Sequence, residues 1–526
     1  MNPAQPVVTT ASGRLRGLQS DGVQEFRGVP FAAPPLGEWR FRAPRPPQPW
    51  VGIRDADRFA PATWQQPNPL MGTEQISDDC LYLNIWAPQG EGPFPVMVWI
   101  HGGAYTSGSP SQALYQGRRL AAEQQVVVVN IAYRLGAWGY SWFADLLPEL
   151  ECDGNLGLRD QLAALQWIAQ NISAFNGDPQ QVTLFGESAG GFSVATLLAV
   201  PAAQSLFQRA IVQSGAADFV LAPEQASLVA ERLLEALPGK GAVADRLLAI
   251  DGRDFVRAQQ AAMRQLVQRG LRTSTPQFGM VYMPVVDGDL LPALPVQAVA
   301  NGAARDKPLL VSLCDDEWHL FQYAPPFNGG VPLSRFLAMD EAEILRRMER
   351  LLPGRGEAAL ACYTESIAVH PARGLMDRVS ALETDRIFRV PSQRLLDAQA
   401  AAGGAAWGCH FSHQIEAFGV PLGACHVLDV PLVFGLVDTP AGKLFTGGGP
   451  AAEQLSVQVM AAWGEFAHHG RVDWSPWGQR RQAHTFGPGA AEMPLLDERR
   501  EQFWQTCIPP YQPVKRDSPL STDNPG

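Results

Sequence analysis

The stretch Gln181–Gly191, QVTLFGESAGG, joins an apolar, β-rich segment to a turn of small residues. Within it, Gly186–Gly190 match the pattern G-x-S-x-G, with Ser188 at the centre. A strand, a sharp turn and a helix in this order form a nucleophile elbow, in which small neighbours let a strained serine stand clear of the sheet. The alternative is a plain glycine-rich turn, since glycine and serine are common. We predict a strand over Gln181–Phe185, a nucleophile at Ser188 and a helix over Ser193–Ala199.

Strand and helix signals alternate around this stretch. Apolar residues at three- and four-residue spacing predict an amphipathic helix over Gly157–Asn171. Short β-rich runs bounded by glycine or proline are typical of buried strands. These runs are Pro95–Ile100 (PVMVWI), Val126–Tyr133 (VVVVNIAY), Ala210–Gln213 and Pro308–Leu313 (PLLVSL). The alternation predicts an α/β fold with a mostly parallel, twisted central sheet and helices on both faces.

The length of 526 residues suggests three or four domains by size alone, yet no linker or repeat divides the chain. The stretches at about 218–305 and 320–402 are rich in helix-forming residues with few strand signals. We therefore expect a single domain over 1–511, in which these helical insertions form the walls of a pocket. The polar, proline-rich end over 512–526 is expected to be a flexible tail.

Composition excludes several classes of function. A net charge of −11, with no dense Lys/Arg cluster, argues against nucleic-acid binding. No apolar run approaches the roughly 20 residues of a membrane span, and the N-terminus has no signal-peptide pattern. The seven cysteines form neither a CxxC pair nor a metal-ligand spacing, so we expect no metal. The odd, unclustered count favours a reducing compartment, which indicates a cytoplasmic protein.

A second glycine-rich turn, His101–Ala104 (HGGA), directly follows the strand predicted at Pro95–Ile100. A serine nucleophile that attacks an ester creates an oxyanion, which backbone N–H groups aimed at that point stabilise. The usual further donor is the N–H that follows the nucleophile, here that of Ala189. The alternative is an ordinary glycine turn after a strand.

A serine nucleophile also needs a basic histidine and an acid that orients it. Three adjacent acids, Asp315–Glu317, follow the strand predicted at Pro308–Leu313, where such an acid belongs. His426 lies in a glycine-containing loop before an apolar segment and is one good candidate for the base. Spacing alone chooses neither among the acids nor among the histidines after Ser188, at positions 319, 370, 410, 413, 426, 468, 469 and 484.

Further motifs follow one another in a distinctive order. They are Glu25–Pro35 (EFRGVPFAAPP), Ser77–Trp86 (SDDCLYLNIW), His101–Ala104, Asn130–Gly139 (NIAYRLGAWG), Gly154–Gln161 (GNLGLRDQ), Phe185–Gly191, Gln213–Gly215, Asp316–Glu317, Gly423–Asp429 (GACHVLD) and Trp463–Gly470 (WGEFAHHG). With this series the chain resembles the type-B carboxylesterase/cholinesterase family of α/β-hydrolases over about residues 5–510. Within it, the chain looks like a bacterial carboxylesterase similar to para-nitrobenzyl esterases.

The resemblance implies a catalytic triad of Ser188, Glu317 and His426. It further implies an oxyanion hole made by the N–H groups of Gly103, Ala104 and Ala189. Glu187 would tune the field beside the nucleophile, and Ser214 would support the triad from nearby. Ion pairs of Arg40 with Asp78 and of Arg134 with Asp160 look like structural features of the family.

The chain also departs from its family. Trp318 stands where glycine usually follows the acid, and Ala104 where a third glycine is common. Secreted relatives pair the cysteine equivalent to Cys80 with an upstream one, but Thr63 stands in the matching stretch, so Cys80 is expected to be free. Cholinesterases bind a quaternary ammonium with a tryptophan where Leu70 stands, so this chain is not expected to be a cholinesterase.

The resulting hypothesis is a serine carboxylesterase that cleaves small-molecule esters through an acyl-serine, with no metal or organic cofactor. The alternatives are a same-fold hydrolase specialised for an amide, carbamate, thioester or toxin ester, and a non-catalytic binding scaffold. The sequence leaves monomer and homodimer open. Aromatic residues near the motifs are candidates for the pocket wall: Trp138, Trp142, Phe219, Phe278, Trp318, Phe321 and Phe411.

Overall fold

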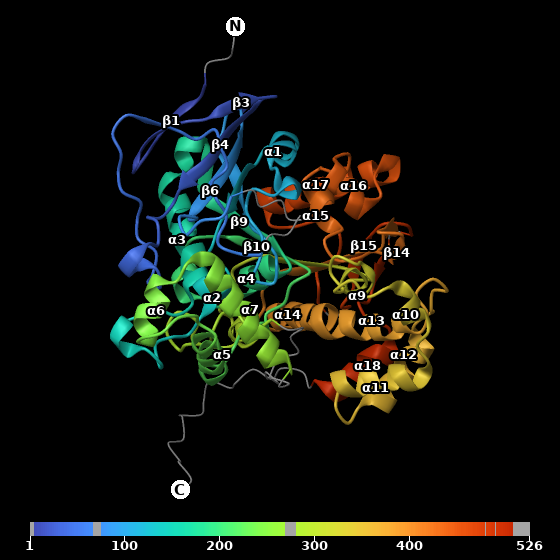
Figure 1. Cartoon of the computed structure of the whole chain (residues 1–526). Helices are drawn as coiled ribbons and strands as arrows, with labels where there is room; N and C mark the ends of the chain where they lie inside the picture. Colours follow the sequence, from blue (N-terminus) through green and yellow to red (C-terminus); the bar gives the residue numbers. More distant parts are fainter. Residues whose placement is uncertain (1–4, 67–74, 269–279, 479, 490, 509–526) are drawn as a thin grey trace, which may run out of the picture.

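An 11-stranded sheet runs through the molecule (Figure 1). The computed structural model describes residues 5–66, 75–268, 280–478, 480–489 and 491–508, so Leu70, Phe278 and the tail predicted over 512–526 lie outside the described residues. In spatial order the strands are β16 (Glu492–Met493), β15 (Ala483–Phe486), β12 (Ala406–Phe411), β11 (Leu309–Cys314), β10 (Arg209–Gln213), β9 (Gly177–Glu187), β7 (Phe94–Ile100), β8 (Val127–Ile131), β6 (Tyr82–Pro88), β4 (Val23–Pro30) and β3 (Leu18–Ser20).

The centre of this sheet is parallel and its edges are antiparallel. Strands from β15 across to β8 pair in parallel, whereas β16, β6, β4 and β3 join antiparallel. Two smaller sheets accompany it, one of β1 (Val7–Thr10), β2 (Gly13–Arg16) and β5 (Ile53–Asp55), the other of β13 (Ile415–Ala417) and β14 (Val420–Gly423). The parallel strands bring their carboxyl ends to one edge, where ligand sites of such sheets lie.

The central strands are apolar on both faces because helices cover both. In β7, Val96 and Val98 belong to one cluster of buried side chains, while Met97 and Trp99 belong to another. This alternation follows from the two-residue period of a strand. The first cluster includes residues of α3 (Leu156–Asn171), α4 (Ala189–Leu197) and α14 (Val390–Ala401), and the second includes residues of α1 (Arg118–Gln124) and α17 (Gly449–His469).

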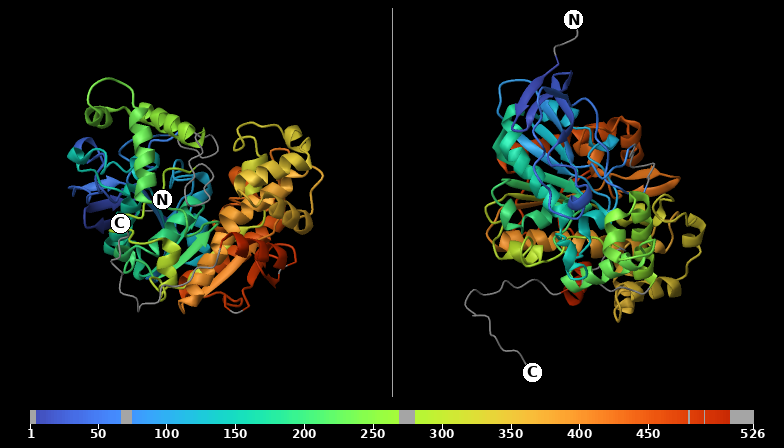
Figure 2. Two further views of the ribbon diagram at one scale, coloured as in Figure 1. Left: turned by 90° about the horizontal axis from the view of Figure 1, so that it is seen from below. Right: turned by 60° about the vertical axis from the view of Figure 1, so that its left-hand side comes forward.

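Most of the other helices lie in the two stretches expected as insertions. Between β10 and β11 come α5 (Pro223–Glu235), α6 (Val243–Ala249), α7 (Gly252–Gln268) and α8 (Pro295–Ala300). Between β11 and β12 come α9 (Trp318–Tyr323), α10 (Leu333–Leu337), α11 (Glu341–Leu351), α12 (Gly356–Ser366), α13 (Met376–Thr384), a π-helical turn over Asp385–Arg389, and α14. Figure 2 shows α5–α7, in green, apart from α10–α12, in yellow. The extent of the single domain, 1–511, stays a prediction.

The remaining helices are α2 (Gly136–Tyr140), α15 (Asp429–Val433), α16 (Pro440–Thr446) and α18 (Glu498–Cys507). The predicted start of α4 was wrong by several residues. Helix α4 begins at Ala189, directly after the serine, and not at Ser193. Glycines have low helix propensity, so the sequence pattern favoured a later start; packing against β9 and β10 overrides that preference.

Candidate active site

Ser188 occupies a sharp turn between β9 and α4. Its backbone has φ 56° and ψ −125°, which is rare for a residue with a side chain, and its N–H donates to Gln213 O at 2.9 Å. The flanking glycines leave no room for a Cβ: one on Gly191 would lie 2.6 Å from Gln213 O, and one on Gly190 would overlap the Ile100 carbonyl. Strain stored at this position exposes the hydroxyl at the carboxyl edge of the sheet.

Glu317 and His426 are in contact with each other. Glu317 ends the turn after β11, and His426 lies in the loop between β14 and α15. His426 Nδ1 lies 2.6 Å from Glu317 Oε2, while Glu317 Oε1 accepts a hydrogen bond from the Cys314 N–H at 2.8 Å. Both side chains are buried. This contact orients the imidazole through Nδ1 and leaves Nε2 to a different partner.

A second carboxylate faces the opposite side of this imidazole. Glu187, the last residue of β9, places Oε1 3.0 Å from His426 Nε2. Within the described residues no hydrogen bond joins Nε2 to Ser188 Oγ. Burial alone would lower the pKa of His426, but the charges of Glu187 and Glu317 raise it to about 10. The site therefore favours a positively charged imidazole.

The HGGA loop lies against the serine turn. A Cβ on Gly102 would approach the Glu187 carbonyl oxygen to 2.8 Å and the Ser188 Cβ to 3.1 Å, so only glycine permits this contact. Gly103 and Ala104 follow with positive φ of 115° and 53°. In the described part of the chain, the N–H groups of Gly103, Ala104 and Ala189 donate to no backbone acceptor, as an anion-binding site requires.

A cavity of about 180 Å³ opens beside these groups. Gly103, Ala104, Glu187, Ser188 and His426 line it, whereas Ala189 does not. Its apolar wall consists of Leu114, Tyr115, Leu320, Phe321, Phe327, Val427 and Phe445, and its polar wall includes Thr106, Ser107 and Gln112. Among the described lining residues, those from an expected insertion come from 320–402 and none comes from 218–305.

The aromatic candidates separate accordingly. Phe321 lines the cavity and lies 5.1 Å from the His426 ring, centroid to centroid. Trp318 packs behind it, 5.1 Å from the Phe321 ring. Trp138, Trp142, Phe219 and Phe411 are not among the described residues of this wall. Phe388, absent from the sequence-based candidates, also packs near the His426 ring, at 5.0 Å between centroids, and lies 6.5 Å from the Phe321 ring.

Ser214 lies close to the site but makes no hydrogen bond with the described side chains of Ser188, Glu317 or His426. It follows β10, is buried, and has φ 45°. Its N–H donates to Ser312 O at 2.8 Å, and its Oγ has no hydrogen-bond partner among the described residues. Its link to the serine is indirect, through the neighbouring Gln213, whose carbonyl holds the Ser188 N–H.

Sequence reasoning missed Asp429, three residues after His426. It is fully buried, and its Oδ2 accepts from Gln213 Nε2 at 2.7 Å, while Gln213 Oε1 accepts from Trp463 Nε1 at 3.1 Å. Burial, with the nearby charge of Glu187, raises the pKa of Asp429 to about 7. The spacing His-x-x-Asp was the only available signal, and acids are too common for that spacing to be specific.

The predicted ion pairs and the free cysteine are present. Arg134 and Asp160 form a buried pair at 2.7 Å, and Arg40 lies 3.4 Å from Asp78. All seven cysteines are free. The Thr63 side chain lies against the thiol of Cys80, whose pKa burial raises to about 12. In the described residues no group of His, Cys, Asp and Glu could hold a metal, and no helix is long and apolar enough to cross a membrane.

Comparison with known proteins gives a consistent result. Residues 4–503 match the family model described as the carboxylesterase family. The chain is 36% identical over 480 residues to para-nitrobenzyl esterase of Bacillus subtilis (strain 168), covering 89% of this chain and 92% of that one. It is 34% identical over 494 residues to fumonisin B1 esterase of Sphingopyxis macrogoltabida, covering 91% and 86%.

Solved structures agree. A PNB esterase structure superimposes with a TM-score of 0.81 at 33% identity, over 96% of this chain and 100% of that one. A carboxylesterase of Geobacillus stearothermophilus gives a TM-score of 0.81 at 34% identity, over 95% and 100%. The predicted α/β-hydrolase fold and the predicted family are thereby confirmed. The chain belongs to the carboxylesterase family and is a carboxylic ester hydrolase of the type-B group.

Proposed function

We propose that this esterase cleaves small esters through an acyl-serine intermediate, with Ser188 as nucleophile, His426 as base and Glu317 as the orienting acid. The observation that carries the proposal is that one cavity is lined by both Ser188 and His426, whose Nδ1 lies 2.6 Å from Glu317. The strained backbone of Ser188 and the free N–H groups of the HGGA loop support the same assignment.

The first step forms the acyl-enzyme. Neutral His426 accepts the Ser188 proton at Nε2 while Ser188 Oγ attacks the ester carbonyl carbon. The carbonyl oxygen becomes an oxyanion that accepts hydrogen bonds from Gly103, Ala104 and Ala189. The imidazolium then gives its proton to the leaving alcohol as the carbon–oxygen bond breaks. In the second step His426 removes a proton from water, the hydroxide attacks the acyl carbon, and Ser188 leaves with the proton restored.

The two carboxylates beside His426 have a specific effect on this cycle. The imidazole must be neutral to accept the first proton and charged in each tetrahedral intermediate. Glu187 at 3.0 Å and Glu317 at 2.6 Å both stabilise the charged form. They therefore stabilise the tetrahedral intermediates. At low pH they also keep His426 protonated in the free enzyme, which cannot then accept the serine proton, so turnover should rise as the pH approaches the pKa of about 10.

The wall of the cavity favours apolar groups on the substrate. Leu114, Phe321, Phe327 and Phe445 offer apolar surface, with Gln112 as a polar partner. The cavity volume of about 180 Å³ is small for a ligand site. We infer a substrate with a short acyl or small aromatic group.

A reducing compartment is part of the proposal, and its support is the set of seven unpaired thiols.

The test is hydrolysis of p-nitrophenyl esters by wild-type protein and by Ser188→Ala. The variant should lose at least about 10,000-fold in kcat, since nucleophile removal in serine hydrolases has effects of this size or larger. An organophosphonate should label the wild-type protein at Ser188. Mass spectrometry of the digested protein would identify the labelled residue. Undiminished turnover by Ser188→Ala would contradict the mechanism. A panel that includes thioesters and amides would then define the substrate.

A further inference from the structure

The turn that carries Glu317 consists of three acids in a row, and each lies near a different histidine. Glu317 contacts His426. Asp315 Oδ1 lies 2.8 Å from His410 Nδ1, and Asp316 Oδ1 lies 3.8 Å from His319 Nδ1. Only the Glu317 pair faces the cavity, so the other two acids need a separate explanation.

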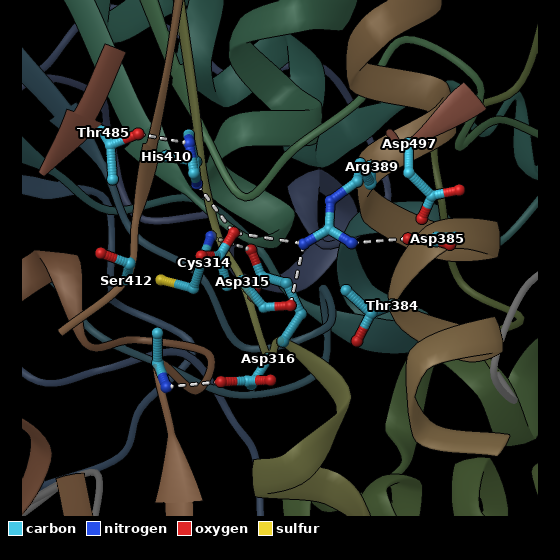
Figure 3. Close-up of polar contacts among 12 residues, drawn as sticks. Cys314, Asp315, Asp316, Thr384, Asp385, Arg389, His410, Ser412, Thr485 and Asp497 are labelled. Atoms are coloured by element: carbon cyan, nitrogen blue, oxygen red, sulfur yellow. Dashed lines mark hydrogen bonds and ion pairs between the residues drawn. The ribbon is translucent and has the colours of Figure 1, made fainter. Parts of the chain in front are cut away.

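Asp315 is held from two directions (Figure 3). On one side, His410 of β12 contacts its carboxylate, and the other ring nitrogen, Nε2, lies 2.8 Å from Thr485 Oγ1 in β15. On the other side, Arg389 donates from one terminal nitrogen to the Asp315 carbonyl oxygen at 2.8 Å and lies 3.3 Å from its carboxylate. The main chain is fixed too, since the Asp315 N–H donates to Phe411 O at 3.0 Å.

Arg389 is itself anchored. It belongs to the π-helical turn Asp385–Arg389, and its second terminal nitrogen donates to Asp385 Oδ1 at 2.7 Å. Asp385 also accepts from Tyr363 of α12 at 2.7 Å and lies 3.3 Å from Arg500 of α18. The same turn carries Phe388, which packs on the His426 ring. Single π-helical turns are frequent at functional sites. This one contacts the histidine ring through Phe388 and the acidic turn through Arg389.

Asp316 ties the turn to the histidine loop. Its N–H donates to the Ala424 carbonyl at 2.9 Å, and its Oδ2 accepts from the Ala424 N–H at 2.9 Å. Ala424 precedes His426 by two residues. The contacts of Asp315 and Asp316 therefore fix the two residues that precede Glu317, while three adjacent carboxylates would otherwise repel one another.

We propose that Asp315, clamped by His410 and Arg389, is a positioning residue that holds Glu317 Oε2 on His426 Nδ1. The proposal rests on the triad proposed above. Burial alone would raise the pKa of Asp315, but His410, Arg389 and Arg500 keep it below its usual range, so the carboxylate stays charged and keeps both contacts. Loss of the clamp frees the turn, and a shift of about 1 Å in a catalytic group can cost about 100-fold in rate.

The experiment measures kcat and KM for p-nitrophenyl acetate in a matched set. Asp315→Ala should lower kcat by about 10- to 100-fold with KM changed less than about twofold. Asp315→Asn, whose Oδ1 still accepts from His410 and Arg389, should restore kcat to within about threefold of wild type. Arg386→Gln is the control: it breaks a buried pair with Glu383, at 2.6 Å in the same segment, without contacting Asp315, and should leave kcat unchanged.

A mutant cycle separates positioning from general loosening. In a Glu317→Ala background, Asp315→Ala should reduce the residual kcat by less than about twofold, because the group it positions is gone. An equal loss in both backgrounds overturns the proposal, as does an unchanged kcat in Asp315→Ala. If Asp315→Ala does not fold, His410→Ala tests the same contact, with kcat expected about tenfold lower and an unchanged kcat overturning the proposal. If Ser188→Ala loses activity while the Asp315 variants keep the kcat of wild type, the positioning role is refuted and the proposed triad is not.

Discussion

Two of the histidine–carboxylate pairs on one turn of this esterase are within hydrogen-bond distance, and they differ in the group that contacts the second nitrogen of the histidine. His426 pairs with Glu317 at 2.6 Å, and its other nitrogen faces Glu187 in the cavity. His410 pairs with Asp315 at 2.8 Å, and its other nitrogen faces Thr485 inside the sheet. A hydrogen-bonded His–acid pair is thus not in itself a catalytic feature. The first pair is distinguished because His426 lines a cavity together with Ser188. The second pair is distinguished by Arg389, whose positive charge lies beside the Asp315 carboxylate.

The largest expected difference comes from removing each histidine. His426→Ala should lower kcat by at least about 10,000-fold, because it removes the proposed base. His410→Ala should lower kcat by about tenfold, because it acts only through Asp315. The measurement is p-nitrophenyl acetate hydrolysis at high enzyme concentration, with circular dichroism to verify folding. Comparable losses in the two variants would remove the distinction between the pairs.

Replacing each acid by its amide sharpens the comparison. Glu317→Gln should lower kcat by about 1,000- to 10,000-fold, since an amide cannot stabilise the imidazolium and favours the wrong tautomer. Asp315→Asn should stay within about threefold of wild type, because its role needs only an acceptor oxygen. The measurement is kcat from steady-state kinetics on the two variants, expressed and purified in parallel. A Glu317→Gln enzyme with near-normal kcat would remove Glu317 from the proposed triad.

Glu187, the second carboxylate beside His426 in the proposed catalytic pair, should control the pH profile. Glu187 raises the pKa of His426, and the proposed mechanism needs neutral His426, so activity should be lost as pH falls below that pKa. Glu187→Gln removes one raising charge, and the acidic limb of kcat/KM should move to lower pH. Asp315→Asn provides the matched control and should leave the limb in place. A limb at the same pH in Glu187→Gln would contradict this assignment.

The smallest expected effect lies at the far end of the second pair. Thr485→Val keeps the shape of the side chain but leaves His410 Nε2 without its partner at 2.8 Å. The free energy of unfolding should fall by about 1–3 kcal/mol, as for other unsatisfied buried polar groups. Urea denaturation measures this change, and kcat should remain within about threefold. A kcat loss above tenfold would mean that the second pair does more than hold the turn.

Local signals predicted the central strands and the serine turn well, because buried parallel strands and glycine-flanked elbows have distinctive patterns. In the run Asp315–Glu317, by contrast, local signals could not predict which acid faces the cavity. All three acids have histidine neighbours in space, and which one faces the cavity depends on the direction of β11 and on loops more than 100 residues away. His410 has a partner as close as that of many catalytic histidines, so no local rule could rank it below His426.

Other features were beyond sequence reasoning for a different reason. The contact of Glu187 with His426 depends on the side chain of a strand-end residue reaching across the sheet edge. The π-helical turn is equally hidden, since Asp385–Arg389 reads as ordinary helix and the extra residue in the turn has no sequence signal. In both cases tertiary packing, and not local preference, determines the outcome.

The π-helical turn Asp385–Arg389 has a consequence for protein engineering. A π-turn amounts to one residue inserted into a helix, so deleting one residue there would rotate the chain before it by about 100° relative to the chain after it. Phe388 would leave the His426 ring and Arg389 would leave Asp315. Chimeras assembled from related esterases should therefore keep this turn and helix α14 from the same parent, and place their crossover points elsewhere.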